Sequence, residues 1–151
     1  MTIRTSTGLK NAMLGEVGLK AALADGVIRI YSGAQPASAD NAVTGTLLME
    51  ITVDGGAFNH GSPTNGLEWD APSAGTISKP AADTWKGSGI AAGVAGWARF
   101  CANPLDDGSA STTLSRVDMS VGKGTGDLQL SSVNVAVSAP ITVDVAILRL
   151  P

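Results

Sequence analysis

Two stretches of alternating polar and apolar residues decide the fold class: Arg116-Val117-Asp118-Met119-Ser120-Val121 and Val133-Asn134-Val135-Ala136-Val137. A period of two places successive side chains on opposite faces of a β-strand. We therefore expect both stretches to be half-buried strands, each with one face in the core and the other face in water.

Short apolar runs separated by turn residues continue this pattern in both directions, from Val27 to the end of the chain. Among the turn signals are Asp54-Gly55-Gly56, Asp106-Asp107-Gly108 and the glycine-rich residues 122–127, where we expect a hairpin turn. Counting the runs gives about eight or nine strands with no helical pattern between them. The sequence predicts a mainly β protein, with an antiparallel β-sandwich or a barrel-like fold.

The first part of the chain has a helical pattern instead. Ser6 is a residue type that favours helix N-caps, and Leu9 and Met13 are spaced to share one face of a helix. Glycines interrupt the pattern, so we expect two short helices or one broken helix. On this basis residues 1–26 form an N-terminal helical arm and residues 27–151 form the β-sandwich domain.

Composition excludes several functional classes. The 151 residues suit a single domain, with 44% hydrophobic and 15% charged residues and a net charge of −3. The 10 basic residues are scattered, so we expect no nucleic-acid partner. The start of the chain has no apolar signal region, and no stretch is apolar enough to span a bilayer. Synthesis in a cytoplasm and no membrane partner are therefore expected.

Residue types that support catalysis or metal binding are scarce. His60 and Cys101 are the single histidine and the single cysteine, so a zinc site built from four such ligands cannot be assembled. We interpret His60 as an ordinary loop histidine and Cys101 as a small core residue. The sequence predicts no catalytic, cofactor-binding or metal-binding residues, and we expect that the protein is not an enzyme.

Three tryptophans leave another class of function open. A tryptophan exposed on a β-sandwich can hold a sugar ring, so a glycan-binding module that uses Trp69 or Trp85 is one alternative. A domain with few aromatic residues needs them in its core, because each buries about 150–250 Å². We therefore favour the core for Trp85 and Trp97.

The sequence also resembles small virion structural proteins of tailed bacteriophages, of the capsid decoration or cement type. Thr84-Trp85-Lys86-Gly87-Ser88-Gly89 is one of the stretches that carry the resemblance. The likeness covers nearly the whole chain, includes no catalytic motif and assigns no role to individual residues. The stretches that carry it are residues 5–12, 26–33, 35–40, 44–48, 66–67, 77–80, 84–89, 95–100 and 127–132.

This resemblance implies a non-enzymatic virion protein, made in the host cytoplasm, that stabilises the head shell. Its partner would then be the phage major capsid protein. A component of the neck, tail or fibre is the alternative position in the particle, with neck or tail proteins as partners. Because homo-oligomers are usually closed and symmetric, we expect a dimer or a trimer.

Four apolar residues of the helical arm are candidate interface residues. They are Leu9, Met13, Leu19 and Leu23, which together could form a small amphipathic anchor. An equally good alternative is that these side chains cover one end of the protein's own sheet.

Overall fold

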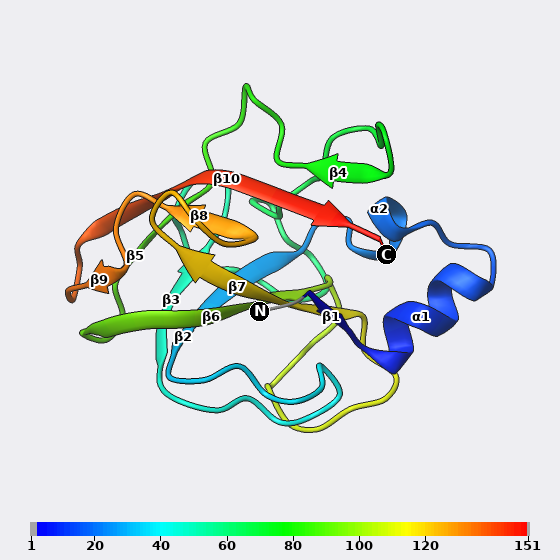
Figure 1. The fold of residues 1–151 in the computed structure, drawn as a ribbon, viewed down its shortest axis with the longest axis horizontal. Helices are drawn as coiled ribbons and strands as arrows, with labels where there is room; N and C mark the ends of the chain where they lie inside the picture. Colours follow the sequence, from blue (N-terminus) through cyan, green and yellow to red (C-terminus); the bar gives the residue numbers. More distant parts are fainter. Residues whose placement is uncertain (1–2, 151) are drawn as a thin grey trace.

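The structure is a computed structural model that describes residues 3–150. Within these residues the chain forms ten strands and two short helices (Figure 1). The helices are α1 (Thr7–Leu14) and α2 (Leu19–Ala22). The strands are β1 (Arg4–Thr5), β2 (Val27–Ser32), β3 (Leu47–Ile51), β4 (Thr76–Ser78), β5 (Lys86–Ser88), β6 (Gly93–Cys101), β7 (Arg116–Gly122), β8 (Leu128–Leu130), β9 (Asn134–Val135) and β10 (Pro140–Arg149).

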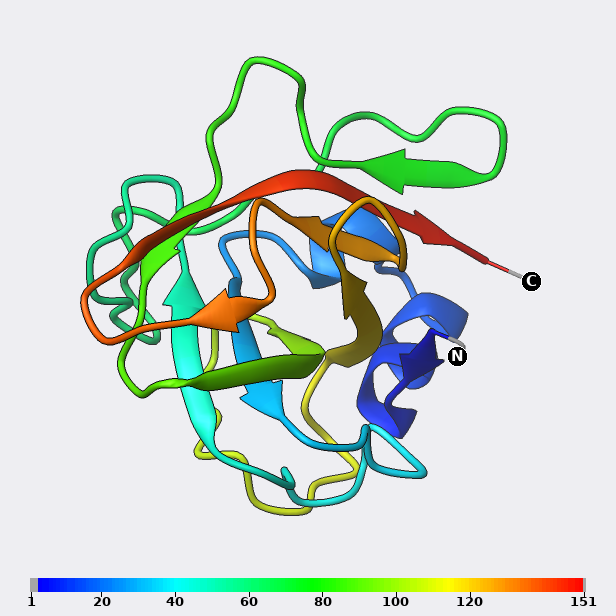
Figure 2. The same cartoon turned by 60° about the vertical axis from the view of Figure 1, so that its left-hand side comes forward.

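The strands belong to one curled sheet with the order β3-β2-β6-β7-β8-β10-β4. Three short strands lie off this path: β1 pairs with β7, β5 with β10 and β9 with β6. The sheet curls into a half-barrel, and a bridge between Thr52 and Lys86 brings the end of β3 back to β5 (Figure 2). The mainly β class is confirmed.

The expectation of a purely antiparallel sheet is wrong at one pairing. Strands β7 and β8 run parallel, with Val121 opposite Leu128, so residues 122–127 are not a hairpin turn. Asp127 Oδ2 accepts hydrogen bonds from the Ser120 backbone N–H (3.2 Å) and Oγ–H (2.7 Å), and the Asp127 N–H donates to Ser120 Oγ (3.0 Å). These hydrogen bonds, here called the Ser120 and Asp127 clasp, fold the chain back, so that β8 begins beside β7 and runs in the same direction.

The expectation of two short helices is confirmed. Ser6 Oγ accepts a hydrogen bond from the Leu9 N–H (3.1 Å), which caps α1, and the helix ends at Gly15. Leu9 and Leu23 are fully buried in the same hydrophobic cluster as the strands, so the helical segment shares the core of the sheet. Between residues 3 and 150, no helix is long and apolar enough to cross a membrane.

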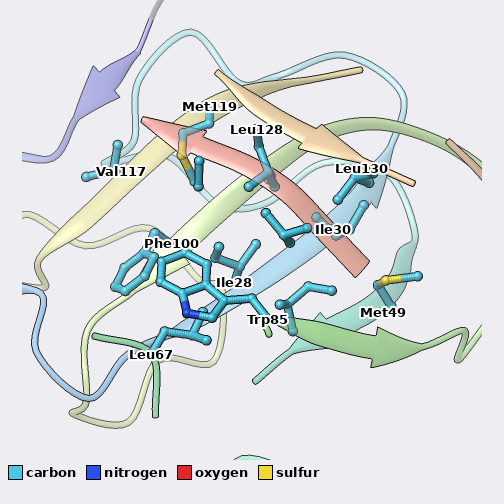
Figure 3. Close-up of a cluster of buried hydrophobic side chains, with 14 of the residues drawn as sticks. Ile28, Ile30, Met49, Leu67, Trp85, Phe100, Val117, Met119, Leu128 and Leu130 are labelled. Carbon is cyan, nitrogen blue, oxygen red and sulfur yellow. The ribbon is translucent and has the colours of Figure 1, made fainter. Parts of the chain in front are cut away.

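Apolar side chains fill the concave side of the half-barrel (Figure 3). Trp69 and Trp85 meet edge to face there, with ring centroids 5.1 Å apart, and Trp69 also contacts Phe100. The labelled core residues of Figure 3 are Ile28, Ile30, Met49, Leu67, Trp85, Phe100, Val117, Met119, Leu128 and Leu130. This core holds the ends of the strands, and the surfaces described below, in fixed positions.

Candidate interaction surfaces

The convex face of the sheet carries a row of charged residues across its central strands. Strand register places Arg29 of β2, Arg99 of β6 and Asp118 of β7 side by side. The Nε and Nη2 atoms of Arg99 donate to the two carboxylate oxygens of Asp118, at 2.6 and 2.9 Å. Both of these side chains are fully buried.

This burial contradicts the expectation that Arg116–Val121 has a water-facing side. Arg116 and Asp118 are 0% exposed and Ser120 is 6% exposed. Two loops lie over this face of the sheet and contact its arginines: residues 33–46, here called the first covering loop, and residues 102–115, the second covering loop. A strand with alternating polar residues is therefore buried on both sides, because its charges find partners under these loops.

Arginine side chains tie both covering loops to the sheet. Arg99 Nη1 donates to the carbonyl oxygen of Asn41 in the first covering loop, at 3.1 Å. Arg116 Nη2 donates to the carbonyl oxygen of Ser109 in the second covering loop, at 2.8 Å. Burial by itself lowers the pKa of Arg99, but its hydrogen bonds with Asp118 raise that pKa above the ordinary value, so the guanidinium stays charged.

His60 lies in a loop, as predicted, and makes contacts that the sequence did not reveal. Arg29 Nη2 lies 2.7 Å from His60 Nε2, while Arg29 Nε donates to Glu50 at 3.0 Å. His60 Nδ1 lies 3.2 Å from the carbonyl oxygen of Pro104. An imidazole that accepts from Arg29 and donates to Pro104 joins its own loop to the second covering loop.

Cys101 is a core residue, as the sequence predicts. It is 1% exposed and packs in a small cluster with Val27 and Phe58. Burial, with the nearby negative charge of Asp106 as a second cause, raises the pKa of the Cys101 thiol to about 12. A thiol with this pKa is not a nucleophile near neutral pH.

The tryptophan arrangement contradicts a glycan-binding site at Trp69 or Trp85. These two side chains are 1% and 0% exposed, so neither ring can stack on a sugar. Burial of Trp85 and Trp97 is confirmed. Trp97 lies on the convex side of the sheet, stacked on Tyr31 at 4.7 Å and with the Arg99 guanidinium 5.4 Å from its ring centroid.

Exposed apolar residues occur in the helical segment and directly after β10. Leu14 is 85% exposed, Val17 is 40% exposed and Leu150 is 51% exposed. A groove of about 460 Å³ lies between α2, β4 and the end of β10, and Leu19, Ile77, Leu148 and Leu150 are among its lining residues. Val17 directly precedes Gly18, which also lines the groove. We call Leu14, Val17, Leu150 and this groove the helix-end patch.

A second apolar patch lies at the other end of the half-barrel. Ile90, Val94 and Val137 are 55%, 60% and 62% exposed, and we call them the loop-end patch. Their segments adjoin, because Gly89 is bridged to Val137 and β6 pairs with β9. Along the longest axis of the molecule, β5 and β9 lie at the opposite end from α1 and α2 (Figure 1).

The four candidate interface residues take different places. Leu9 and Leu23 are fully buried, so they cover the end of the protein's own sheet, which was the alternative left open for them. Met13 and Leu19 are partly buried against the core, and Leu19 also lines the groove of the helix-end patch. Sequence reasoning missed Leu14, which follows Met13 directly and ends the helical run.

Comparisons with known proteins identify no relative of this chain. No family model, no curated protein and no solved structure matches this chain. Within residues 3–150, no three His, Cys, Asp or Glu side chains are grouped so that they could hold a metal ion. Functional inference therefore starts from the two apolar patches and from the rigid body that separates them.

Proposed function

We propose that this protein is a non-enzymatic structural protein of a tailed-phage virion, namely a capsid decoration (cement) protein that docks on the major capsid protein. The observation that carries the proposal is the placement of exposed apolar patches at opposite ends of one β body. A cement protein must make at least two contacts, because it reinforces a shell only by linking neighbouring molecules. Two separated patches on one body meet this requirement.

Rigidity of the body supports the same function. On the convex side, the buried Asp106–Arg116 ion pair fixes the second covering loop and the hydrogen bond from Arg99 to Asn41 fixes the first, while the apolar core fills the concave side. Because both sides of the central strands are packed, we expect the body to resist local unfolding when load is applied at one end. The resemblance to small virion proteins, stated above from the sequence, supports the particle as the place of action.

The loop-end patch is the surface that we assign to the shell. The chain carries no charged residue between Lys86 and Arg99 or between Asp127 and Asp144, so the two segments that carry this patch are uncharged. Its backbone is also tightly packed, since a Cβ atom placed on Gly89 would lie 2.0 Å from the carbonyl oxygen of Ala136. Docking of an uncharged, apolar and rigid surface costs little free energy, because few polar groups lose water and few side chains become ordered.

Binding to capsids tests this proposal. Purified protein is mixed with phage heads that lack it, and the bound fraction is measured by sedimentation. Val94→Asp places a charge in the loop-end patch and should weaken the affinity for heads by about tenfold or more. A tenfold loss corresponds to about 1.4 kcal/mol of binding free energy. Leu105→Asp is the matched control, because Leu105 is 73% exposed in the second covering loop, outside both patches.

The outcomes are distinct. Binding of the wild type and of Leu105→Asp, with loss in Val94→Asp, supports docking through the loop-end patch. Equal binding by Val94→Asp would reject that surface. Binding to tails or necks but not to heads would reject the decoration role and favour the alternative position in the particle. Binding to none of these parts would overturn the proposal.

A further inference from the structure

We infer that the helix-end patch is a self-association surface, on which two copies of this chain pair about a two-fold axis. The inference goes beyond the proposed function, because it concerns the free protein and requires no virion. It rests on the shape, exposure and charge of residues 14–20 and of the groove beside them.

Each copy carries an apolar projection and an apolar groove side by side. Leu14 and Val17 project from the end of α1 and from the turn that follows it, and they are 85% and 40% exposed. The groove begins directly after this turn, at Gly18 and Leu19, and continues to Ile77. A two-fold axis between projection and groove lets each copy fill the groove of the other, which is the defining property of an isologous contact.

The charges beside the patch point to a second copy as the occupant. Glu16 lies between the two projecting residues, and Lys20 lines the groove. Neither residue belongs to a salt bridge within residues 3–150. In an isologous pair, residue i faces residue j and j faces i, so Glu16 of each copy can face Lys20 of the other. This pair of opposite charges is self-complementary, so it favours a contact between copies and sets the register of that contact.

Single substitutions test the surface in the purified protein. The wild type should sediment as a dimer, with twice the chain mass of 15.1 kDa, at high concentration and should dissociate on dilution. Leu14→Lys should shift the protein to monomer, with dimer affinity reduced about tenfold or more. The fold should tolerate this change, because the leucine is exposed and a cation is favourable at a helix C-terminus. Leu105→Asp should leave the dimer intact.

Charge reversal tests the two-fold register more sharply. Glu16→Lys alone brings two lysines together at each contact, and Lys20→Glu alone brings two glutamates together, so each variant should be monomeric. When the two variants are mixed, both contacts join opposite charges, and a heterodimer should form. The double variant Glu16→Lys/Lys20→Glu should dimerise with itself.

Several results would overturn the inference. One is a wild type that stays monomeric at every concentration. Another is a dimer that Leu14→Lys leaves unchanged while circular dichroism shows a native fold. A third is a wild type that is monomeric and binds capsids more tightly than the Leu14→Lys variant does, because the shell would then occupy the groove. None of these results decides whether the loop-end patch binds capsids, so this inference and the proposed function can fail separately.

Discussion

Asp106 and Arg116 form an ion pair with two hydrogen bonds, in which Arg116 Nε and Nη2 donate to the two carboxylate oxygens at 2.7 Å each. Asp106 belongs to the second covering loop and Arg116 begins β7, so the pair holds the loop on the sheet. Both residues are buried, with 2% and 0% of their surface exposed. Charge pairing attaches this loop to the sheet, so the loop should respond strongly to loss of one charge.

Acid should weaken the attachment of this loop. Burial alone would raise the pKa of Asp106, but hydrogen bonds from Arg116 and from the Gly108 N–H outweigh it and hold the pKa below the ordinary 3.8. Because the folded pKa is the lower one, the stabilisation is fully present above the unfolded value and is lost as pH falls through the folded value. Urea unfolding of the wild type should therefore require less urea as the pH is lowered below about 4.

Asp106→Asn is the matched variant for this acid response. It should be less stable than the wild type near neutral pH by about 3–5 kcal/mol, because Arg116 keeps a buried charge without its partner. The difference between the two proteins should shrink in acid, where the wild type also loses the carboxylate charge. A difference that stays constant from neutral pH into acid would show that Asp106 does not contribute through its charge.

The buried pair of Arg99 and Asp118 should show strong coupling. Asp118→Leu should cost about 3–5 kcal/mol, since it leaves the Arg99 guanidinium without a carboxylate partner. The double variant Arg99→Met/Asp118→Leu should recover much of this loss, because neither charge is then buried. Urea unfolding of the four proteins of the cycle gives the coupling energy, and additive effects of the two changes would rule out the pairing.

Cys101 should be a reporter of global unfolding. With a pKa of about 12 and 1% exposure, the thiol should not react with a disulfide reagent in the native protein near neutral pH. It should react completely once urea unfolds the chain, and the reaction rate should follow the unfolding curve. Rapid reaction without urea would mean that the cluster of Cys101, Val27 and Phe58 opens easily.

Two glycines with the same backbone angle should respond differently to alanine. Gly33 has φ +80°, and a Cβ added to it would meet no atom of another segment within 4 Å. Gly45 has φ +79°, but a Cβ added to it would lie 1.9 Å from the Ser32 carbonyl oxygen. Gly33→Ala should cost about 1–2 kcal/mol from left-handed strain alone. Gly45→Ala should cost clearly more, because strand ends must also move apart. Equal losses in thermal unfolding would contradict this close approach.

Local signals in the sequence were sufficient for the helices and for the β class. Ser6 caps α1 through a bond to Leu9 three residues away, and Gly15 ends the helix. Such features depend on neighbours in the chain, so they can be predicted from spacing and residue type. The same is true of Cys101, whose apolar neighbours in the chain predicted its burial.

Contacts between distant segments account for what was missed. Alternation in β7 predicted a water-facing side, but the partners that bury Arg116 and Asp118 come from the second covering loop and from β6. The parallel pairing of β7 with β8 depends on the Ser120 and Asp127 clasp, which local turn propensities do not reveal. The helix-end patch likewise forms only where α2 meets β4 and β10, so spacing within the arm could not identify it.

The copy number of this chain per major capsid protein in purified particles tests the decoration role most directly. Quantitative mass spectrometry of particles assembled with the wild-type chain provides the ratio. We expect a ratio near one, or a simple fraction of it, because a decoration protein occupies equivalent positions over the whole shell. A trace amount equal to a single ring or spike would contradict that role and favour the neck or tail, and absence from particles would refute a virion function.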